Sequence, residues 1–502
     1  MLRLTKVLMA GAAVMALAAC GSAEVASPGE GDFGTSTPTT PTTPTTPITP
    51  TPGTPAADCP TGLSNIGLVA GGTLRACQLP SVITGNLSLA VRAGTIYAIA
   101  GATQVGVDRG IDGTGGTQGI LTIDPGVRIF ASGGGDALVV NRGSQIFAEG
   151  TATNPIIFTS RQNVEGTTTN TSQGQWGGII IAGRAPQANC QLTAPVACTG
   201  TVEGGLSVFY GGNTAADNSG RLRYIQIKYS GFQVSPGNEL QGLTLAGTGS
   251  GTTISHIQVY NSSDDGIEIF GGNANLSYLV INGADDDGLD TDTGWRGGAQ
   301  FGIITQRATP ETGGGRGFEW SAAPTPTPYA TRYLSQPKVS NFTIVGRNAA
   351  VAADAVIRLD SGTDATILNS VFTNPTTSVS ACLDINSADT ITSTPTFSSV
   401  SFACSTPFAT AAVAGTAAAF GTGTNNNNST ATSTLTAPTT GVTITNQSLN
   451  FINGANETAV TATNANAVYA FFVQTNYIGA VRNATDTWYQ GWTCGLTSGL
   501  TC

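Results

Sequence analysis

The stretch that decides the fold is Ile254-Ser-His-Ile-Gln-Val-Tyr260, which is followed after a short turn by Gly266-Ile-Glu-Ile-Phe270. Both segments return 22 residues later, as Leu276-Ser-Tyr-Leu-Val-Ile-Asn282 and Gly288-Leu-Asp-Thr-Asp292. Each is short, mostly rich in β-branched residues and bounded by Gly, Asn or Asp, which is typical of a β-strand that ends in a turn. The repeat therefore predicts pairs of short strands that recur at a fixed period.

Further copies of this unit lie on both sides of the quoted stretch. The first strand also matches Leu222-Arg-Tyr-Ile-Gln-Ile-Lys228 and Val339-Ser-Asn-Phe-Thr-Ile-Val345. Matches to the second strand are Gly242-Leu-Thr-Leu-Ala246, Gly317-Phe-Glu-Trp-Ser321, Val356-Ile-Arg-Leu-Asp360 and Cys382-Leu-Asp-Ile-Asn386. No sustained helical spacing of apolar residues accompanies them. Repeats of this kind predict a solenoid, in which stacked coils share an interior that one coil cannot form alone.

Alternation within the second strands separates inward-facing from outward-facing side chains, because successive residues of a strand point to opposite faces. The side chains between the inward-facing residues are expected to face outward. The residues that we expect to fill the interior are Ile267, Ile269, Leu289, Thr291, Phe318, Trp320, Ile357 and Leu359.

Several stretches carry a resemblance to a known family. They are Gly143–Thr159, Gln175–Gly183, Asn238–Thr244, the acidic turns at 264–268 and 285–292, and the terminal Tyr477–Val481, Trp488 and Gly491-Trp492. In these stretches the chain resembles bacterial surface and secreted β-helix lipoproteins, whose fold belongs to the pectate-lyase-like superfamily. The resemblance covers roughly 60–502 and implies an all-β, right-handed parallel β-helix with N- and C-terminal caps. It implies no particular activity, since one fold hosts many functions.

The start of the chain is typical of a targeting signal followed by a linker. Positive charge at Arg3 and Lys6 precedes a short apolar run, which predicts a signal peptide over 1–19 rather than a membrane span. The ending Leu17-Ala-Ala-Cys20 resembles a bacterial lipobox, which implies lipidation of Cys20 and delivery to the outer membrane. Residues 20–57 continue as a Thr/Pro-rich linker, which favours extended polyproline II.

The rest of the chain divides by composition. We expect an N-terminal cap over 58–120, the β-helix proper over 121–404, low-complexity loops or irregular coils over 405–464, and a C-terminal cap over 465–502. Caps are expected because an open solenoid end exposes unpaired strand edges.

Eight of the nine cysteines remain once Cys20 is assigned to lipidation. A zinc site is not expected, because the chain has no Cys-x-x-Cys spacing and no pair of histidines. They fall in the sequence as four close couples, and an oxidising compartment suits a secreted protein. We therefore expect the disulfides Cys59–Cys77, Cys190–Cys198, Cys382–Cys404 and Cys494–Cys502.

The charge balance excludes one class of partner. The chain holds 20 basic and 30 acidic residues, a net charge of −10. A nucleic-acid-binding protein needs a basic face, so no nucleic acid is expected as a ligand. The only histidine, His256, excludes a metal centre built on several histidines.

The sharpest candidate for a functional site is acidic. Asp264-Asp-Gly-Ile-Glu268 lies one period before Asp286-Asp-Gly-Leu-Asp290, so stacking places each carboxylate over its counterpart, about 4.8 Å away. Carboxylates at that spacing repel one another unless something neutralises them. Hard oxygen ligands from two turns suit Ca²⁺. The candidate calcium ligands are Asp264, Asp265, Glu268, Asp286, Asp287, Asp290 and Asp292.

Two other interpretations of these acids remain open. In one, Arg296, Arg316 and Arg358 pair with the acids, and the outward column continues through Glu319. In the other, the acids are solvated side chains at turns. Trp295 lies in a Gly-rich loop after the acidic turn and is a candidate to stack on a sugar ring. These four charged residues and Trp295 are the candidate ligand-binding residues.

These features favour an outer-membrane lipoprotein, at the periplasmic face or the cell surface, that binds a polysaccharide, a surface polymer or an outer-membrane partner. One alternative is a calcium-dependent polysaccharide lyase or a glycoside hydrolase, since paired carboxylates carry out glycoside hydrolysis. Ser263–Gly266 resembles the Asp-Asp motif of polygalacturonases, but the accompanying motifs of that family are missing, so no catalytic residue is assigned. The other alternative is a structural component of the cell surface.

Overall fold

The structure is a computed structural model, and the part of the chain discussed here is one compact unit within Pro50–Cys502. The expected signal peptide, Cys20 and the linker up to residue 52 lie outside the described residues, as does Cys190. Within the described part, no helix has the length and hydropathy needed to cross a membrane. The structure describes residues 53–188, 198–307, 315–322, 333–347, 355–375, 378, 380–438, 448–496 and 502.

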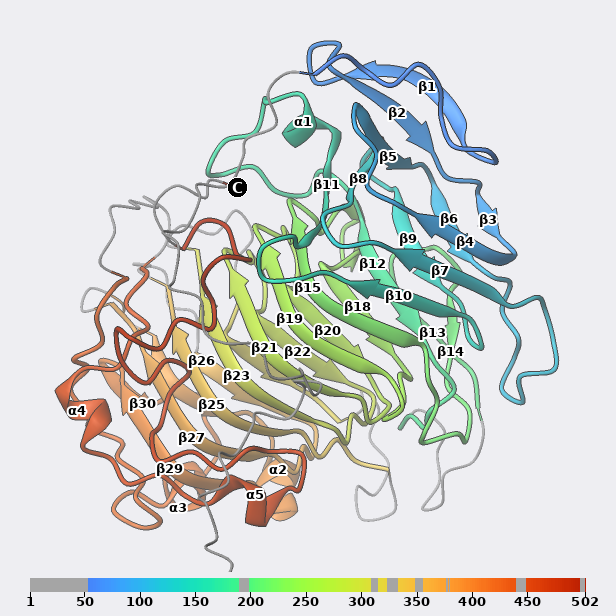
Figure 1. The fold of residues 1–502 in the computed structure, drawn as a ribbon. Coiled ribbons are helices and arrows are strands. Elements are labelled where there is room, and N and C mark those ends of the chain that lie inside the picture. The colour runs from blue at the N-terminus through green and yellow to red at the C-terminus, as the bar shows by residue number, and fades with distance from the viewer. Residues whose placement is uncertain are drawn as a thin grey trace, which may run out of the picture. The chain divides into compact units, whose positions relative to one another are not determined.

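The chain winds into coils, and strands of successive coils stack in parallel (Figure 1). One strand of each coil belongs to an 11-stranded sheet, here termed the short-strand sheet. Its strands, in spatial order, are β3 (Val82–Ile83), β6 (Ala102–Val105), β9 (Ala137–Val140), β12 (Gly178–Ala182), β18 (Leu243–Ala246), β20 (Ile267–Phe270), β22 (Leu289–Asp292), β24 (Phe318–Trp320), β26 (Ala355–Leu359), β28 (Ala381–Ile385) and β30 (Thr406–Phe408).

The remaining strands of the coils form a 15-stranded sheet, here termed the long-strand sheet. Its path is β1 (Ser64–Val69), β2 (Leu74–Gln78), β5 (Thr95–Ile99), β8 (Arg128–Ala131), β11 (Ile156–Ser160), β15 (Gly220–Lys228), β19 (Thr253–Tyr260), β21 (Asn275–Asn282), β23 (Gly298–Thr305), β25 (Lys338–Val345), β27 (Thr366–Thr373) and β29 (Thr396–Ala403). Off this path lie β4 (Gly85–Leu89), β7 (Gly119–Ile123) and β10 (Gln145–Glu149). β10 pairs with the first half of β15, and β11 pairs with its second half. From β15 onward, one long strand therefore takes the place of two strands of the earlier coils.

Small elements are added to the coils among the described residues. Two antiparallel hairpins are formed by β13 (Gly200–Thr201) with β14 (Phe209–Tyr210) and by β16 (Gln233–Ser235) with β17 (Asn238–Glu239). The helices are α1 (Arg161–Val164), α2 (Ala388–Ser393), α3 (Thr416–Phe420), α4 (Ala455–Thr458) and α5 (Ala465–Val468).

The interior of the coils is a continuous hydrophobic core. Ile267 and Leu289 are register partners on adjacent strands, which matches the 22-residue period of the sequence. All eight side chains expected to face inward are at most 1 % exposed. Burial of one such aliphatic or aromatic side chain contributes about 1.5–3 kcal/mol, so the stacking of coils stabilises the fold. The predicted right-handed parallel β-helix is therefore confirmed.

Each long strand bends at one residue in the left-handed conformation, with φ between 47° and 63°. The residues at these bends are Tyr224, His256, Tyr278, Phe301, Asn341, Asn369 and Ser399. Because such φ values strain β-branched side chains most, Val, Ile and Thr, frequent elsewhere in these strands, do not occupy these positions. Ring centroids are 4.2 Å apart for Tyr224 and His256, 4.5 Å for His256 and Tyr278, and 4.9 Å for Tyr278 and Phe301. The bends therefore align four rings in one stack.

The described part of 465–502, for which we expect a cap on the last coil, instead returns along the long-strand sheet as far as β15. Gln226 Nε2 donates a 2.7 Å hydrogen bond to the carbonyl oxygen of Trp492, and Gln258 Nε2 donates one of 2.7 Å to that of Cys494. Outward-facing glutamine side chains near the bends thus donate hydrogen bonds to the backbone carbonyls of this segment, which is not part of a sheet. This return path covers the ring stack.

The two ends of the solenoid are closed by other residues. Phe420 of α3 is 1 % exposed and stacks on Phe402 with ring centroids 4.2 Å apart, so the last coil is closed from within 405–464. At the first end, β1 pairs antiparallel with β2. Parallel stacking begins already at β2, which pairs with β5, inside the 58–120 region that we expect to be a cap.

Disulfides join neighbouring parts of the solenoid. The expected pair Cys190–Cys198 includes Cys190, which lies outside the described residues. Cys494 and Cys502 of the last disulfide pack against Tyr229 and Tyr260. The expected pairs that the structure confirms are Cys59–Cys77, Cys382–Cys404 and Cys494–Cys502.

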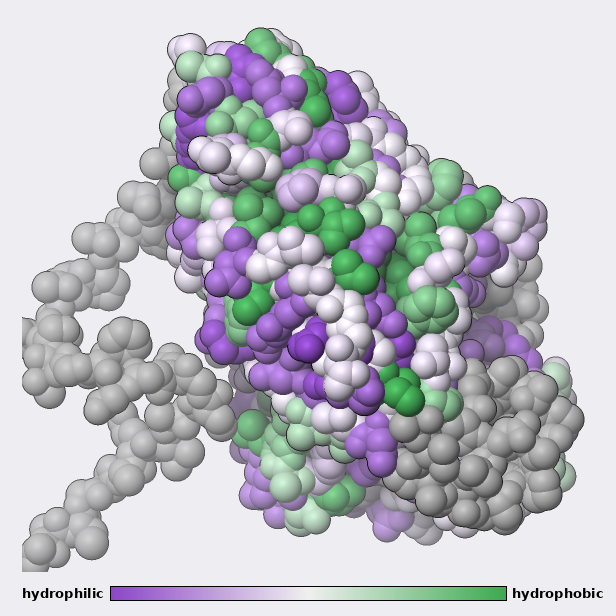
Figure 2. All heavy atoms as spheres, turned by 90° about the vertical axis from the view of Figure 1, so that its right-hand side faces the viewer, coloured by the Kyte–Doolittle hydropathy of each residue, from purple (hydrophilic) through white to green (hydrophobic). Residues whose placement is uncertain are grey.

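The face of the molecule shown in Figure 2 mixes hydrophilic and hydrophobic residues, with the hydrophobic ones in small groups. Exposed apolar side chains such as Val91 and Val107 are spread along the described part of the chain. Scattered apolar residues of this kind are ordinary for a protein surface. These apolar residues therefore do not mark a functional site.

Candidate functional site

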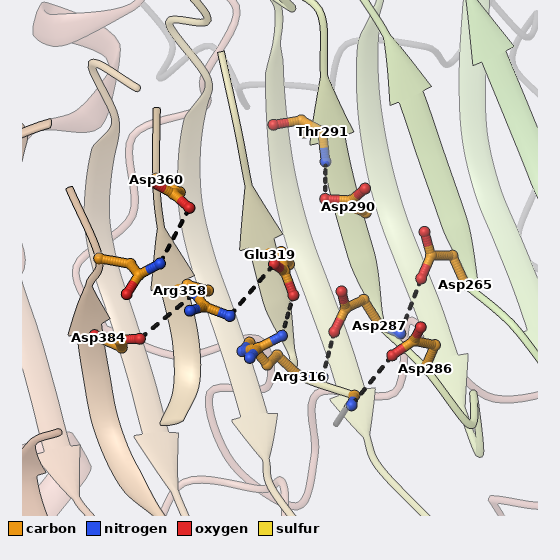
Figure 3. A network of polar contacts seen from close by, with 12 residues as sticks. Asp265, Asp286, Asp287, Asp290, Thr291, Arg316, Glu319, Arg358, Asp360 and Asp384 are labelled. Carbon is orange, nitrogen blue, oxygen red and sulfur yellow. Dashed lines mark hydrogen bonds and ion pairs between the residues drawn. The ribbon is translucent and has the colours of Figure 1, made fainter. Parts of the chain in front are cut away.

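A column of charged side chains runs along the outer face of the short-strand sheet. Glu268 on β20 is the register partner of Asp290 on β22, which pairs in turn with Glu319 on β24. Arg358 on β26 and Asp384 on β28 continue the column. The order expected from the aligned strands is confirmed, and Figure 3 shows the column from Asp290 onward.

A second column lies in the turns before these strands and contains Asp265, Asp287 and Arg316. Asp265 Oδ1 accepts a 2.9 Å hydrogen bond from the backbone N–H of Asp287, and Asp287 Oδ1 accepts one from the backbone N–H of Arg316 (Figure 3). The glycine of the turn permits this approach, because a Cβ on Gly266 would lie 2.8 Å from the carbonyl oxygen of Gly288 in the next turn. Each Asp-Asp-Gly turn thus directs one carboxylate toward the next coil.

The seven candidate calcium ligands, here termed the acidic ladder, lie in the turns or on the outer face of the strands, and all of them are buried or half-buried. Asp265, Glu268 and Asp287 are only 7 %, 5 % and 5 % exposed. The β13–β14 hairpin covers the neighbouring strands, where Val202 packs in one cluster with Ile180. The acids therefore do not have the environment of solvated turn residues.

Burial raises the pKa of the ladder carboxyls, and their mutual repulsion raises it further. The pKa of Asp264 rises to about 8, because of burial first and the charge of Asp286 second. Burial is also the main cause that raises the pKa of Asp292 to about 7. The pKa values of Asp265 and Glu268 rise well above their usual range for the same reasons. Such carboxyls are stable only when they hold a proton or contact a cation.

Arginines neutralise the part of the column beyond the ladder. Arg316 forms an ion pair with Glu319, and Arg358 Nη1 lies 3.8 Å from the same carboxylate. Arg358 Nε also lies 3.5 Å from Asp384 Oδ2. The arginine interpretation therefore accounts for Glu319 and Asp384.

Asp285 is a second acid that arginines neutralise, immediately beside the ladder. Its carboxylate is fully buried and lies 3.9 Å from Arg307 Nε and 3.8 Å from Arg347 Nη1. Gln173 Nε2 donates a further hydrogen bond of 3.2 Å to it. In contrast, no ion pair between described residues includes a carboxylate of the acidic ladder.

Two groups of ladder oxygens are close enough to hold a metal ion. One oxygen each from Asp264, Asp265 and Asp286 lie within 4.8 Å of one another, and the same holds for Asp265, Glu268 and Asp290. Glu268 Oε2 is buried and has no hydrogen-bond partner. An anionic donor set made only of oxygen matches the preference of Ca²⁺.

Comparison with known proteins places this fold in a family. The family model for the pectate-lyase-like β-helix domain matches residues 85–493, which is most of the chain. The chain belongs to the pectate-lyase-like β-helix family. No curated protein and no solved structure matches it. The expected resemblance is thereby confirmed for the fold family, and the narrower likeness to surface lipoproteins stays a prediction.

In this pectate-lyase-like β-helix, two of the expected ligand-binding residues lie away from the ladder. Trp295 is 0 % exposed, and its Nε1 donates a 3.0 Å hydrogen bond to the carbonyl oxygen of Ala274. Its ring fills the coil interior and offers no surface for a sugar. Arg296 lies over the ring of Tyr333, 3.6 Å from the centroid, rather than beside an acid.

Sequence reasoning missed Glu203, which the β13–β14 hairpin brings to the ladder. Gln241 Nε2 donates a 2.5 Å hydrogen bond to Glu203 Oε1, and Gln241 Oε1 accepts one of 2.8 Å from Thr244, the register partner of Glu268. Tyr210 of the same hairpin lies 3.2 Å, hydroxyl to hydroxyl, from Thr293. The hairpin is an insertion outside the repeat, so the 22-residue period gives no information on where its residues lie.

Proposed function

We propose that this protein is a lipid-anchored β-helix of the outer membrane that binds calcium at the acidic ladder and binds a polysaccharide through the calcium-loaded face. One observation carries the proposal. Glu268 has a buried oxygen without a hydrogen-bond partner, and its carboxylate lies within 4.8 Å of those of Asp265 and Asp290.

A divalent cation removes the energetic cost that this ladder otherwise has. An unpaired buried charge costs several kcal/mol after relaxation, and neighbouring carboxylates add their repulsion. Calcium accepts carboxylates from flexible, partly irregular geometries. Two adjacent coils supply such oxygens here. This supports neutralisation of the ladder by calcium rather than by arginines.

The pectate-lyase-like domain supports a carbohydrate as the ligand. A solenoid presents the same outer face coil after coil, which suits a long polymer. Calcium held by the protein has coordination positions left for anionic groups of such a polymer. Catalysis is the alternative, but the arginines near the ladder, Arg316 and Arg358, are paired with Glu319 and Asp384.

Melting of the full chain in excess calcium and in EDTA tests the cation. A ligand that binds only the folded state stabilises it by about 2.7 kcal/mol at a hundredfold excess over its Kd, so calcium should raise the Tm. Asp290→Asn should remove most of that rise. The matched control is Asp389→Asn, an exposed acid on α2, which should keep the rise. An unchanged wild-type Tm would remove calcium from the proposal.

Retention on immobilised acidic polysaccharide, in calcium and in EDTA, tests the ligand. Retention only in calcium supports calcium-bridged binding. Release of shortened chains would make the protein an enzyme instead. Without retention, the polysaccharide is wrong, and a protein partner or a structural role takes its place.

The anchor has its own test, since it rests on the sequence around Cys20. Wild-type protein is expected in the membrane fraction after a high-salt wash, and Cys20→Ser in the soluble fraction. Equal distribution of both proteins would contradict the lipid anchor. Protease treatment of intact cells then separates the cell surface from the periplasmic face.

A further inference from the structure

A hairpin inserted between two coils lies beside the acidic ladder. It follows β12 and precedes β15, and its strands pair through Gly200 with Tyr210 and Thr201 with Phe209. The hairpin is therefore not a part of the stacked coils, and its position depends on what it contacts.

Apolar contacts hold one side of the hairpin on the short-strand sheet. Val202, Val208 and Tyr210 are at most 4 % exposed and share one hydrophobic cluster with Val139 of β9 and Ile180 of β12. The outer face of the sheet changes from apolar to acidic farther along, at β20. The hairpin thus lies over the apolar strands that border this change.

Glu203 is the hairpin residue whose carboxyl reaches the acidic side of that boundary. Gln241 Nε2 donates a 2.5 Å hydrogen bond to Glu203 Oε1, and Gln241 is itself oriented by a 2.8 Å hydrogen bond from Thr244 Oγ1. The chain turns immediately afterwards at Gly204, whose φ is +79° and where a Cβ would lie 2.2 Å from Leu240 Cδ2. The tight turn and the amide fix the direction of the Glu203 side chain.

Glu203 is therefore held next to Glu268, because Gln241, which bonds Glu203, also accepts a hydrogen bond from Thr244, the register partner of Glu268. Glu268 is 5 % exposed, its Oε2 has no hydrogen-bond partner, and its register partner on the hairpin side is the neutral Thr244. Neither glutamate belongs to an ion pair between described residues. Two ionised carboxylates in this position repel each other, while the apolar contacts of the hairpin keep them together.

Glu203 is not among the oxygens that already lie within 4.8 Å of one another. We propose that its side chain moves onto the cation held by Asp265, Glu268 and Asp290 as a further ligand, so that cation binding and closure of the β13–β14 hairpin are one event. The inference rests on the cation site proposed above. Coupling of this kind is reciprocal. A chain without the cation has a loosened hairpin, and a chain without the Glu203 carboxylate binds the cation more weakly.

Amide hydrogen exchange of the full chain, in calcium and in EDTA, measures the hairpin directly. The informative amides are Val202, bonded to Val208 O at 2.9 Å, and Gly211, bonded to Gly183 O at 2.9 Å. In the wild type, calcium is expected to slow exchange in the peptide that contains them by about tenfold. Calcium affinity, measured by titration calorimetry, is the second readout.

Glu203→Gln separates a ligand from a merely structural residue. It removes the repulsion, so its hairpin should exchange more slowly than the wild type in EDTA, whereas loss of a structural contact would speed exchange. In calcium, the variant should bind about tenfold more weakly and its hairpin should no longer respond. The matched control is Glu239→Gln. The charge of Glu239 also raises the pKa of Glu203, but the Glu239 carboxylate accepts hydrogen bonds from Gln233 and Gly237.

The outcomes distinguish this inference from the proposal on which it rests. If calcium binds the wild type, and Glu203→Gln changes neither affinity nor the response of the hairpin, Glu203 is no ligand and only the hairpin coupling is overturned. If calcium does not bind the wild type at all, the cation site fails and the coupling fails with it. Equal effects of Glu203→Gln and Glu239→Gln would assign the result to net charge and overturn the ligand role.

Discussion

The carboxylate of Asp265 accepts a 2.9 Å hydrogen bond from the backbone N–H of Asp287, the residue that occupies the same place one coil later. This bond engages one oxygen of the carboxylate and fixes the direction of the other. The geometry of the turn needs a hydrogen-bond acceptor at this position, whereas a cation needs a negative charge. Substitutions that keep one property and remove the other separate the two roles.

Asp265→Asn and Asp265→Ala are expected to change stability in EDTA with opposite signs. Asparagine keeps an acceptor oxygen and removes a carboxyl whose pKa burial raises, which should raise the free energy of unfolding by about 1.4 kcal/mol for each pKa unit of that rise. Alanine leaves the Asp287 N–H without a partner and should lower it by about 1–3 kcal/mol. Both variants should lose the stabilisation by calcium. Urea unfolding measures both effects, and equal destabilisation by the two substitutions would contradict the argument.

Asp285→Asn is expected to behave differently from Asp287→Asn, although the residues are neighbours. Arg307 and Arg347 are 1 % and 2 % exposed and lie within 4.0 Å of the Asp285 carboxylate. Removing one partner of a buried ion pair costs about 3–5 kcal/mol, so Asp285→Asn should destabilise the chain in calcium and in EDTA alike. Asp287→Asn in EDTA should not. Thermal unfolding in both buffers checks the pair, and a calcium-dependent effect at Asp285 would place it in the ladder instead.

The sequence predicts the stacking of the acidic ladder because its coils are equal in length. With a period of 22 residues, the alignment of Glu268 with Asp290 follows from counting, and the structure has the same register. For longer coils, the alignment of Asp290 with Glu319 follows instead from the alternation of inward-facing and outward-facing residues along each strand. Local pattern is therefore enough to predict the fold class and the columns on its face.

What surrounds the ladder has no such period. Glu203 comes from an inserted hairpin, and Trp492 comes from a segment far along the chain that reaches Tyr224. The positions of both residues depend on contacts between segments that are distant in sequence. Neither segment belongs to the repeat, so no local pattern predicts these contacts. The sequence does not predict the burial of Trp295, because a Gly-rich neighbourhood is typical of a surface loop. In the structure, Gly297 instead lets the backbone pass close to the indole ring.

Trp492→Ala is expected to destabilise the chain, because Trp492 anchors the C-terminal segment on the ring stack. Its ring centroid lies 5.8 Å from that of Tyr224 and 5.6 Å from that of His256, and it is 0 % exposed. Truncation of such a residue costs about 3–5 kcal/mol. Limited proteolysis should then cleave the segment after 448 sooner than the coils. Trp488→Ala is the comparison, since Trp488 is only partly buried, and an equal effect would contradict the anchoring role.

His256 gives the protein a pH dependence with a defined sign. Its ring stacks between Tyr224 and Tyr278, and its Nδ1 is buried without a hydrogen-bond partner. Burial, and after it the charge of Arg223, lowers the pKa of His256 from 6.5 to about 3. Between these values the unfolded chain binds a proton that the folded chain does not. Stability is therefore lost as the pH falls through this window, by up to about 1.4 kcal/mol per pH unit.

His256→Phe is expected to remove this contribution and keep the stack, because Phe301 already occupies an equivalent left-handed position with φ of 63°. Carboxyl groups titrate in the same window, so the quantity to measure is the difference in unfolding free energy between wild type and variant at pH 7 and at pH 4.5. The wild type should lose more on acidification, since only its unfolded state gains the histidine proton. The chain has one histidine, so its NMR signal titrates without overlap. A midpoint near 6.5 in the folded protein would show that the ring is open to water, and the C-terminal segment would then not cover the stack.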